Sequence, residues 1–220
     1  MSQGAVGPGP IGVPDVKVCG LTDPGQARAC ATAGAWGIGL VFARASTRYI
    51  DERAGREISR ALPDHVARVG VFVDPEPAAV ARLARAVGLT HLQVHGRFNL
   101  AALREAAGLP LIEAVRVADS SALGRVCASP ADLVLLDAAV PGTHGGTGIP
   151  FDWSLVEEHR PERPFGVAGG LRSANVGEVI RRLRPSLVDV SSGVECAPGQ
   201  KDSARVVEFF AAVERAVRER

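Results

Sequence analysis

Short apolar runs alternate with longer amphipathic stretches from Val16 to the end of the 220-residue chain, and no linker-like break interrupts them. The last amphipathic stretch, "SARVVEFFAAVERAVRER" over residues 203–220, places apolar residues at helical spacing and ends in basic residues, which suit the carboxyl end of a helix dipole. This alternation predicts repeated strand-helix units and a parallel sheet.

Eight strands are predicted, and turn chemistry marks the helices between them. Asp23 can cap a helix whose first turn holds Pro24, and another helix can end at Gly88. Eight units in about 205 residues predict a closed (β/α)8 barrel of one domain. An open doubly wound sheet is the alternative, but no G-x-G-x-x-G opens the first helix. The predicted strands cover residues 16–19, 36–42, 66–73, 91–95, 111–117, 132–137, 165–169 and 187–192.

The first fifteen residues, "MSQGAVGPGPIGVPD", are rich in Gly and Pro and show no apolar period. Such a segment buries too little apolar surface to offset the entropy of ordering it. We therefore expect a flexible leader over residues 1–15 and a barrel domain over residues 16–220.

Composition removes several classes of partner. The chain has 25 basic and 24 acidic residues, a formal charge of +1, and no basic block that could follow a phosphate backbone, which argues against nucleic acid. No apolar run approaches the ~20 residues that span a bilayer, and the first fifteen residues have neither the basic start nor the apolar segment typical of a signal peptide. We expect a cytoplasmic protein. Four scattered cysteines indicate neither a disulfide framework nor a metal site.

Polar residues end several of the predicted strands, at the rim where barrel enzymes carry their active sites. Cys19 ends the first strand and is a candidate nucleophile or base, although a lone cysteine is also a common small core residue. Asp137 ends the sixth and is a candidate acid, or else a residue that shapes the next loop. His95 ends the fourth and either contacts ligand or forms a hydrogen bond in the core.

Glycine-rich turns and two basic residues add binding chemistry. Gly169, Gly170 and Gly193 follow the last two strands, where this fold often binds phosphate, although glycine also serves plain turns. Arg48 follows the second strand and suits a carboxylate or phosphate, although most surface arginines are only solvated. Lys17 is in phase with Cys19 and should point inward, which favours a buried ion pair with Asp189 over a Schiff-base lysine.

An ordered set of motifs then identifies a resemblance. The segments "KVCGLT", "LVFARASTRYI", "VGVFVD", "LQVHG", "LLDA", "GGTG" with "FDW", "AGGL", "VDVSSGVE" and "PGQKD" resemble the phosphoribosylanthranilate isomerases of tryptophan biosynthesis, from Val16 to Asp202. The resemblance implies a (β/α)8 barrel that performs an Amadori rearrangement of a small phosphorylated substrate without metal or organic cofactor, as a monomer or homodimer.

The resemblance also implies residue roles. Cys19 matches the family's general base, Asp137 its general acid, and Arg48 the arginine that holds the anthranilate carboxylate. Further substrate contacts are implied for His95 and Asp189. Phosphate binding is implied for Gly146, Gly169, Gly170, Ser192 and Gly193.

The chain departs from the family pattern at Trp36, Arg97, Ile149, Pro150 and Gln200, none of which is a catalytic group. Two other functions stay open. The related histidine-pathway isomerase and the dual-substrate barrel have an aspartate where this chain has Cys19 and show a half-barrel repeat that is not visible here. A phosphate-metabolite-binding barrel without catalysis is the second alternative.

Overall fold

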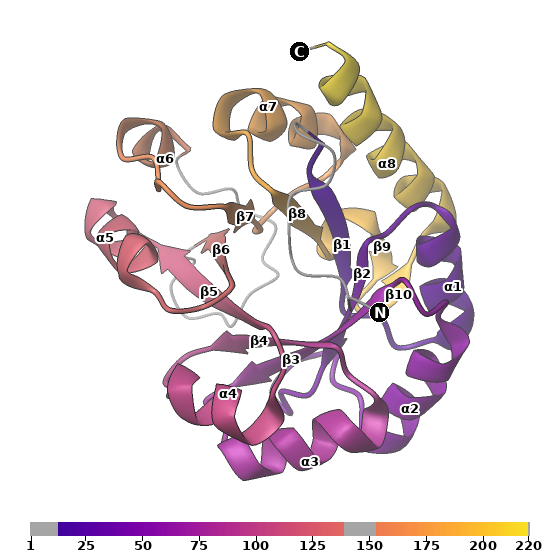
Figure 1. The fold of residues 1–220 in the computed structure, drawn as a ribbon. Coiled ribbons are helices and arrows are strands. Elements are labelled where there is room, and N and C mark those ends of the chain that lie inside the picture. Colours follow the sequence, from indigo (N-terminus) through magenta and orange to yellow (C-terminus); the bar gives the residue numbers. More distant parts are fainter. Residues whose placement is uncertain (1–12, 139–152, 220) are drawn as a thin grey trace.

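The computed structural model describes residues 13–138 and 153–219, and these form a closed barrel of eight parallel strands. The strands pair in chain order, and β1 pairs with both β2 and β8. Figure 1 shows the strands at the centre and the helices around them, with α8 closing the ring beside α7 and α1. The predicted (β/α)8 barrel is confirmed. The leader expected over residues 1–15 lies largely outside the described residues.

The strands agree with the predicted positions to within a few residues at each end. They are β1 (Asp15–Cys19), β2 (Gly37–Val41), β3 (Ala67–Val73), β4 (His91–His95), β5 (Leu111–Val117), β6 (Leu133–Ala138), β7 (Phe165–Val167) and β8 (Leu187–Val190). The helices are α1 (Pro24–Thr32), α2 (Glu52–Ala61), α3 (Pro77–Val87), α4 (Leu100–Ala107), α5 (Ser120–Ala128), α6 (Ser154–Glu158), α7 (Ser173–Leu183) and α8 (Ser203–Arg218).

One feature was not predicted. After β8 the chain forms a short 3-10 helix (Ser192–Val194) and a small antiparallel hairpin of β9 (Glu195–Ala197) and β10 (Gln200–Lys201). A register shift in this hairpin leaves only two paired positions, Gln200 with Ala197 and Lys201 with Glu195. Strands this short carry no apolar alternation that could announce them in the sequence.

Capping residues define the helix ends as the sequence indicates. The Asp23 side chain accepts a hydrogen bond from the Gln26 N–H, with Pro24 in the first turn of α1. Gly88 ends α3 at a φ of 77°, a left-handed conformation that glycine adopts without steric cost. These local signals fix where each strand-helix unit turns back to the barrel.

The apolar core has two layers. The larger lies between the strands and the helices, and the smaller fills the barrel interior with side chains such as Val69, Ile112 and Leu135. Trp36 packs against the inner layer and its ring meets that of His91 edge to face. The interior is therefore a packed core, and a ligand can enter only at an end.

A buried ion pair stands in this interior at the junction of β1 and β8. Lys17 is fully buried, and its Nζ lies 2.9 Å from each carboxylate oxygen of Asp189, the residue beside it in the strand register. The ion pair expected from the sequence is confirmed. Burial alone would lower the pKa of Lys17, but the negative groups around it hold that pKa above its ordinary value, so the ammonium persists. In the described part of the chain, no helix is long and apolar enough to cross a membrane.

Removing one partner should expose the cost of this pair. Lys17→Met leaves the Asp189 carboxylate buried without its cation, so we expect a loss of about 3–5 kcal/mol in the free energy of unfolding, measured with denaturant at neutral pH. The unpaired carboxyl should have a raised pKa when folded, so the loss should shrink as the pH falls and Asp189 takes up a proton.

The double variant Lys17→Met, Asp189→Leu is the control, because it removes both charges and should recover most of the loss. A single variant as stable as the wild type would show that the pair does not hold this junction.

Candidate active site

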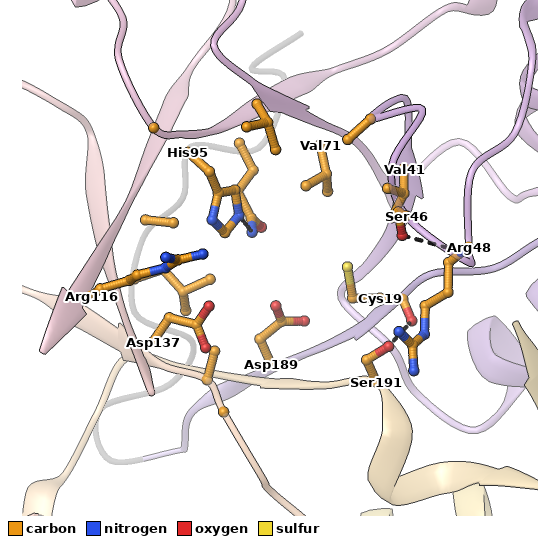
Figure 2. A pocket seen from close by; sticks show the side chains of 18 of the residues that line it. Cys19, Val41, Ser46, Arg48, Val71, His95, Arg116, Asp137, Asp189 and Ser191 are labelled. Atoms are coloured by element: carbon orange, nitrogen blue, oxygen red, sulfur yellow. Dashed lines mark hydrogen bonds between the residues drawn. The ribbon is translucent and has the colours of Figure 1, made fainter. Parts of the chain in front are cut away.

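A cavity of about 830 Å³ opens at the carboxyl ends of the barrel strands. Figure 2 shows Cys19 and Asp137 pointing into it from different sides, with Asp189 between them. Eight of the predicted site residues line this cavity, namely Cys19, Arg48, His95, Asp137, Gly169, Gly170, Asp189 and Ser192. Gly193 is not among the lining residues, and Gly146 lies outside the described residues.

Cys19 is the last residue of β1, and two glycines shape its surroundings. Gly20 takes a φ of 78° and turns the chain away from the strand. Gly39, its partner on β2, leaves no room for a side chain, since a Cβ there would stand 2.6 Å from the Cys19 Sγ. The Cys19 thiol can therefore occupy this place only because residue 39 on β2 has no side chain.

The charge state of the thiol depends on neighbours of both signs. Burial raises the pKa of Cys19, and the ammonium of Lys17 opposes this effect without cancelling it. Lys201 acts in the same sense as Lys17, while the Asp189 carboxylate adds to the rise. The thiol is thus largely protonated in the free protein, with two ammonium groups placed to stabilise its ionised form.

Asp137 comes from β6, which β7 and β8 separate from β1 in the barrel. Its side chain is 8% exposed and lines the cavity. Arg116 is its register partner on β5 and lines the same wall, as Figure 2 shows. A carboxyl and a thiol thus face one cavity from non-adjacent strands, so they can act on two sides of one ligand.

Arg48 lies at the cavity wall beside Cys19 and is partly engaged. Its Nε and Nη2 donate to the two carboxylate oxygens of Glu195, at 2.8 and 2.6 Å. Its Nη1 donates to no other residue in the described ranges and is available to a ligand. The guanidinium is therefore anchored along one edge and open along another.

His95 and Asp189 also belong to the polar lining of the cavity. The His95 Nε2 lies 2.9 Å from the amide nitrogen of Gln93, two residues earlier on β4. Asp189 faces the cavity while it holds Lys17 beneath. Gln93, which also lines the cavity, thus holds His95, and the buried Lys17 holds Asp189.

The loops after β7 and β8 form a backbone-lined corner. Gly169 and Gly170 take φ values of 85° and 65°, and a Cβ on Gly193 would stand 1.9 Å from the Leu171 carbonyl oxygen, so the two loops touch. The N–H groups of Gly169, Gly170, Ser192 and Gly193 donate to no acceptor among the described residues. Several free N–H groups at one corner can receive an anion.

Sequence reasoning missed Glu195, Lys201 and Gly39. Lys201 is buried, and its Nζ donates to Glu195 and to the backbone carbonyls of Cys19 and Ser191. The available signal was a turn at Pro198 and Gly199, flanked by an acid and a lysine that it could bring together. Within the described ranges, no group of three or more His, Cys, Asp or Glu side chains could hold a metal ion.

The fold and this cavity define a (β/α)8-barrel protein of the enzyme class, with its site at the carboxyl ends of the strands. A family model for N-(5'-phosphoribosyl)anthranilate isomerase matches residues 16–212. The chain belongs to this family.

Individual relatives agree with the family model. The isomerase of Rubrobacter xylanophilus is 45% identical over 200 residues, which cover 90% of this chain and 97% of that protein. The isomerase of Acidithiobacillus ferrooxidans is 42% identical over 200 residues, which cover 90% of this chain and 96% of that protein. The crystal structure of the Thermotoga maritima enzyme matches with a TM-score of 0.85 at 38% identity, covering 92% and 99%. Another solved isomerase, in complex with reduced 1-(o-carboxyphenylamino)-1-deoxyribulose 5-phosphate, has a TM-score of 0.80 at 35% identity, covering 92% and 99%.

The ionisation of Cys19 can be measured directly. Because burial raises its pKa, we expect the rate of alkylation by iodoacetamide to reach its midpoint above the value of about 8.5 typical of a free thiol. Peptide mass spectrometry separates Cys19 from the exposed Cys127 and Cys196, which serve as internal references for the reagent. A Cys19 midpoint at or below that value would show that burial does not raise the pKa of this thiol.

Gly39 offers a test of how Cys19 is held. Gly39→Ala places a methyl group against both the Sγ and the Cα of Cys19, so we expect a loss of about 1–3 kcal/mol in the free energy of unfolding, with slower turnover. Gly124→Ala is the matched control, because Gly124 lies within α5 with open space around it and alanine there should stabilise the helix by about 0.5–1 kcal/mol. Equal effects at the two positions would remove the steric argument.

Proposed function

We propose that the protein converts N-(5'-phosphoribosyl)anthranilate to 1-(2-carboxyphenylamino)-1-deoxyribulose 5-phosphate in tryptophan biosynthesis, with Cys19 as general base and Asp137 as general acid. The observation that carries the proposal is that this thiol and this carboxyl lie at the carboxyl ends of β1 and β6 and face one cavity. An Amadori rearrangement needs one group that gives a proton and another that takes one. Membership of the isomerase family supports the same assignment.

The first step opens the sugar. Asp137 donates its proton to the ring oxygen while the bond from that oxygen to C1 breaks, and the nitrogen lone pair forms a C1=N double bond. The products are a ring-opened hydroxyl, an Asp137 carboxylate and a cationic iminium. A carboxyl that is 8% exposed suits this step, because water competes little for its proton.

The second step removes the proton from C2. The Cys19 thiolate takes it, and the C–H electrons form a C1=C2 double bond as the iminium nitrogen becomes neutral. The resulting enolamine tautomerises to the ketone. Cys19 has a raised pKa in the free protein, and the iminium charge formed in the first step favours its thiolate just when the base is needed. Tautomerisation moves the C2 hydroxyl proton of the enolamine to C1, and proton exchange with solvent then returns Cys19 to its thiolate and Asp137 to its carboxyl form. The rearrangement is redox-neutral, so the scheme calls for no cofactor.

Binding groups surround these two residues. The free Nη1 of Arg48 suits the anthranilate carboxylate on the Cys19 side of the cavity. The unpaired N–H groups at Gly169, Gly170, Ser192 and Gly193 suit the phosphate. His95 and Asp189 are left to contact the sugar between them. Gly146, the remaining predicted phosphate contact, stays a prediction.

Two alternatives have clear tests. The histidine-pathway substrate should be offered beside the anthranilate adduct, because turnover of both would make this a dual-substrate isomerase. Binding without turnover would identify a phosphate-metabolite-binding barrel. A cytoplasmic location and a monomeric or homodimeric state stay predictions, although a solved Thermotoga maritima relative is described as dimeric.

The assigned roles predict the behaviour of two variants. Asp137→Asn keeps the shape of the side chain but cannot donate the proton, so kcat should fall by about 10²–10⁴ with a much smaller change in KM. Cys19→Ser should do comparable damage, because a hydroxyl is a poor base. Conversion is followed by the fluorescence of the anthranilate adduct, with circular dichroism to verify folding. A folded variant that retains wild-type kcat would defeat the proposed mechanism.

A further inference from the structure

We propose that Glu195, held in place by Lys201, is a positioning residue that orients Arg48 toward a carboxylate on the substrate. The inference rests on the proposed function, because it requires a substrate carboxylate at Arg48. It assigns a role to an ion cluster formed by Arg48, Glu195 and Lys201, of which only Arg48 lines the cavity.

The contact between Glu195 and Arg48 fixes the guanidinium plane. Two parallel hydrogen bonds, at 2.8 and 2.6 Å, join the Nε and Nη2 edge of Arg48 to both oxygens of Glu195. A bidentate contact of this kind sets direction as well as distance. A guanidinium has five N–H donors in one plane, and the contact with Glu195 uses those of Nε and Nη2. The Nη1 group is left for a ligand, and its direction is set by the orientation of this plane. Figure 2 places Arg48 beside Cys19 at the cavity wall.

Glu195 is itself tightly held. The Lys201 Nζ lies 2.7 Å from Oε1, which also accepts the N–H of Gly199 at 3.2 Å. The side chains of Lys201 and Glu195 are 1% and 5% exposed, so water does not compete for these bonds. The same ammonium donates to the carbonyl of Cys19 at 2.6 Å. Glu195 is therefore fixed relative to the strand end that carries the thiol.

The charges of the cluster favour an anion. Two cations and one anion leave a net charge of +1, so Lys201 offsets the negative charge that Glu195 brings next to Arg48. Burial acts to raise the pKa of Glu195, but hydrogen bonds from Arg48 and Lys201 outweigh burial and lower it, so the carboxylate persists at neutral pH. The cluster thus orients the guanidinium and still leaves it attractive to a carboxylate.

A purely structural role makes a different prediction. If the cluster only held the β9–β10 hairpin in place, its loss would lower the affinity of the cavity for every ligand to the same extent. A positioning role weakens only ligands that carry the carboxylate. The two roles are therefore separated by a pair of ligands that differ in that group alone.

The test is Glu195→Gln, with binding measured by calorimetry for two stable probes. One is reduced 1-(2-carboxyphenylamino)-1-deoxyribulose 5-phosphate, and the other is the same molecule without the carboxyl group. Glutamine keeps the size of the side chain but loses the charge and one acceptor. We expect the affinity for the carboxylated probe to fall on the order of 10-fold, the scale of a charge-assisted hydrogen bond, and the affinity for the other to change by less than about 3-fold. In turnover, KM should rise while kcat changes far less.

Glu157→Gln is the matched control. Glu157 makes the same two-bond contact with Arg182, at 2.8 and 2.7 Å, on α6 and away from the cavity lining. It should alter neither affinity. If Glu195→Gln fails to fold, Glu195→Asp keeps the charge that faces Lys201 but shortens the side chain, and it should show the same selective loss.

Equal losses for both probes, or no loss for the carboxylated one, would overturn the inference. Failure of the proposed function would look different, because the wild-type protein itself would not prefer the carboxylated probe or would not turn over the substrate. Arg48→Ala gives the largest effect expected, since it should abolish the preference for the carboxylated probe that Glu195→Gln only reduces.

Discussion

The ion pair between Lys17 and Asp189 fixes the junction on which the site depends. It joins β1 to β8, the first and last strands of the barrel, in the register that places the two residues side by side. Cys19 lies two residues further along β1 and so shares the inward-facing phase of Lys17, and Ser191, just after β8, lines the cavity beside it. A slip of one residue would turn Lys17 and Cys19 outward together and leave Asp189 buried without its cation. The cost of an unpaired buried charge therefore also protects the position of the thiol.

A second ionic layer builds on the first. The Lys201 ammonium donates to the backbone carbonyls of Cys19 and Ser191, so it contacts the carboxyl ends of both β1 and β8. Lys201 also donates to Glu195, which in turn holds the guanidinium of Arg48. The lower pair is neutral and lies inside the barrel, whereas the upper cluster carries one positive charge beside the cavity. The separation leaves the interior without net charge and gives the rim an attraction for anions.

The fold was predictable because its signals are local. A capped turn at Asp23 and Pro24 or an ending at Gly88 can be recognised in a few residues, and eight repeats of the pattern define the barrel. The inward phase of Lys17 and Cys19 follows from alternation along one strand, which is why the pairing with Asp189 could be anticipated. Roles that depend on contact between distant segments could not. No residue near Gly39 in the sequence indicates that Cys19 occupies the space where a side chain of residue 39 would lie. Glu195 and Arg48, which contact each other, are 147 positions apart in the sequence.

The departures from the family pattern also become intelligible once they are placed in the fold. Trp36 precedes β2 at the opposite end of the barrel from the cavity, where it packs against His91. Arg97 and Gln200 are exposed and do not line the cavity. Gln200 is informative because its neighbour Lys201 is buried in the ion cluster. Of these two adjacent polar positions, Gln200 is exposed, and Lys201 is buried and donates to the Cys19 carbonyl and to Glu195. In the described part of the chain, the departures thus fall where neither the thiol, the carboxyl nor the guanidinium depends on them.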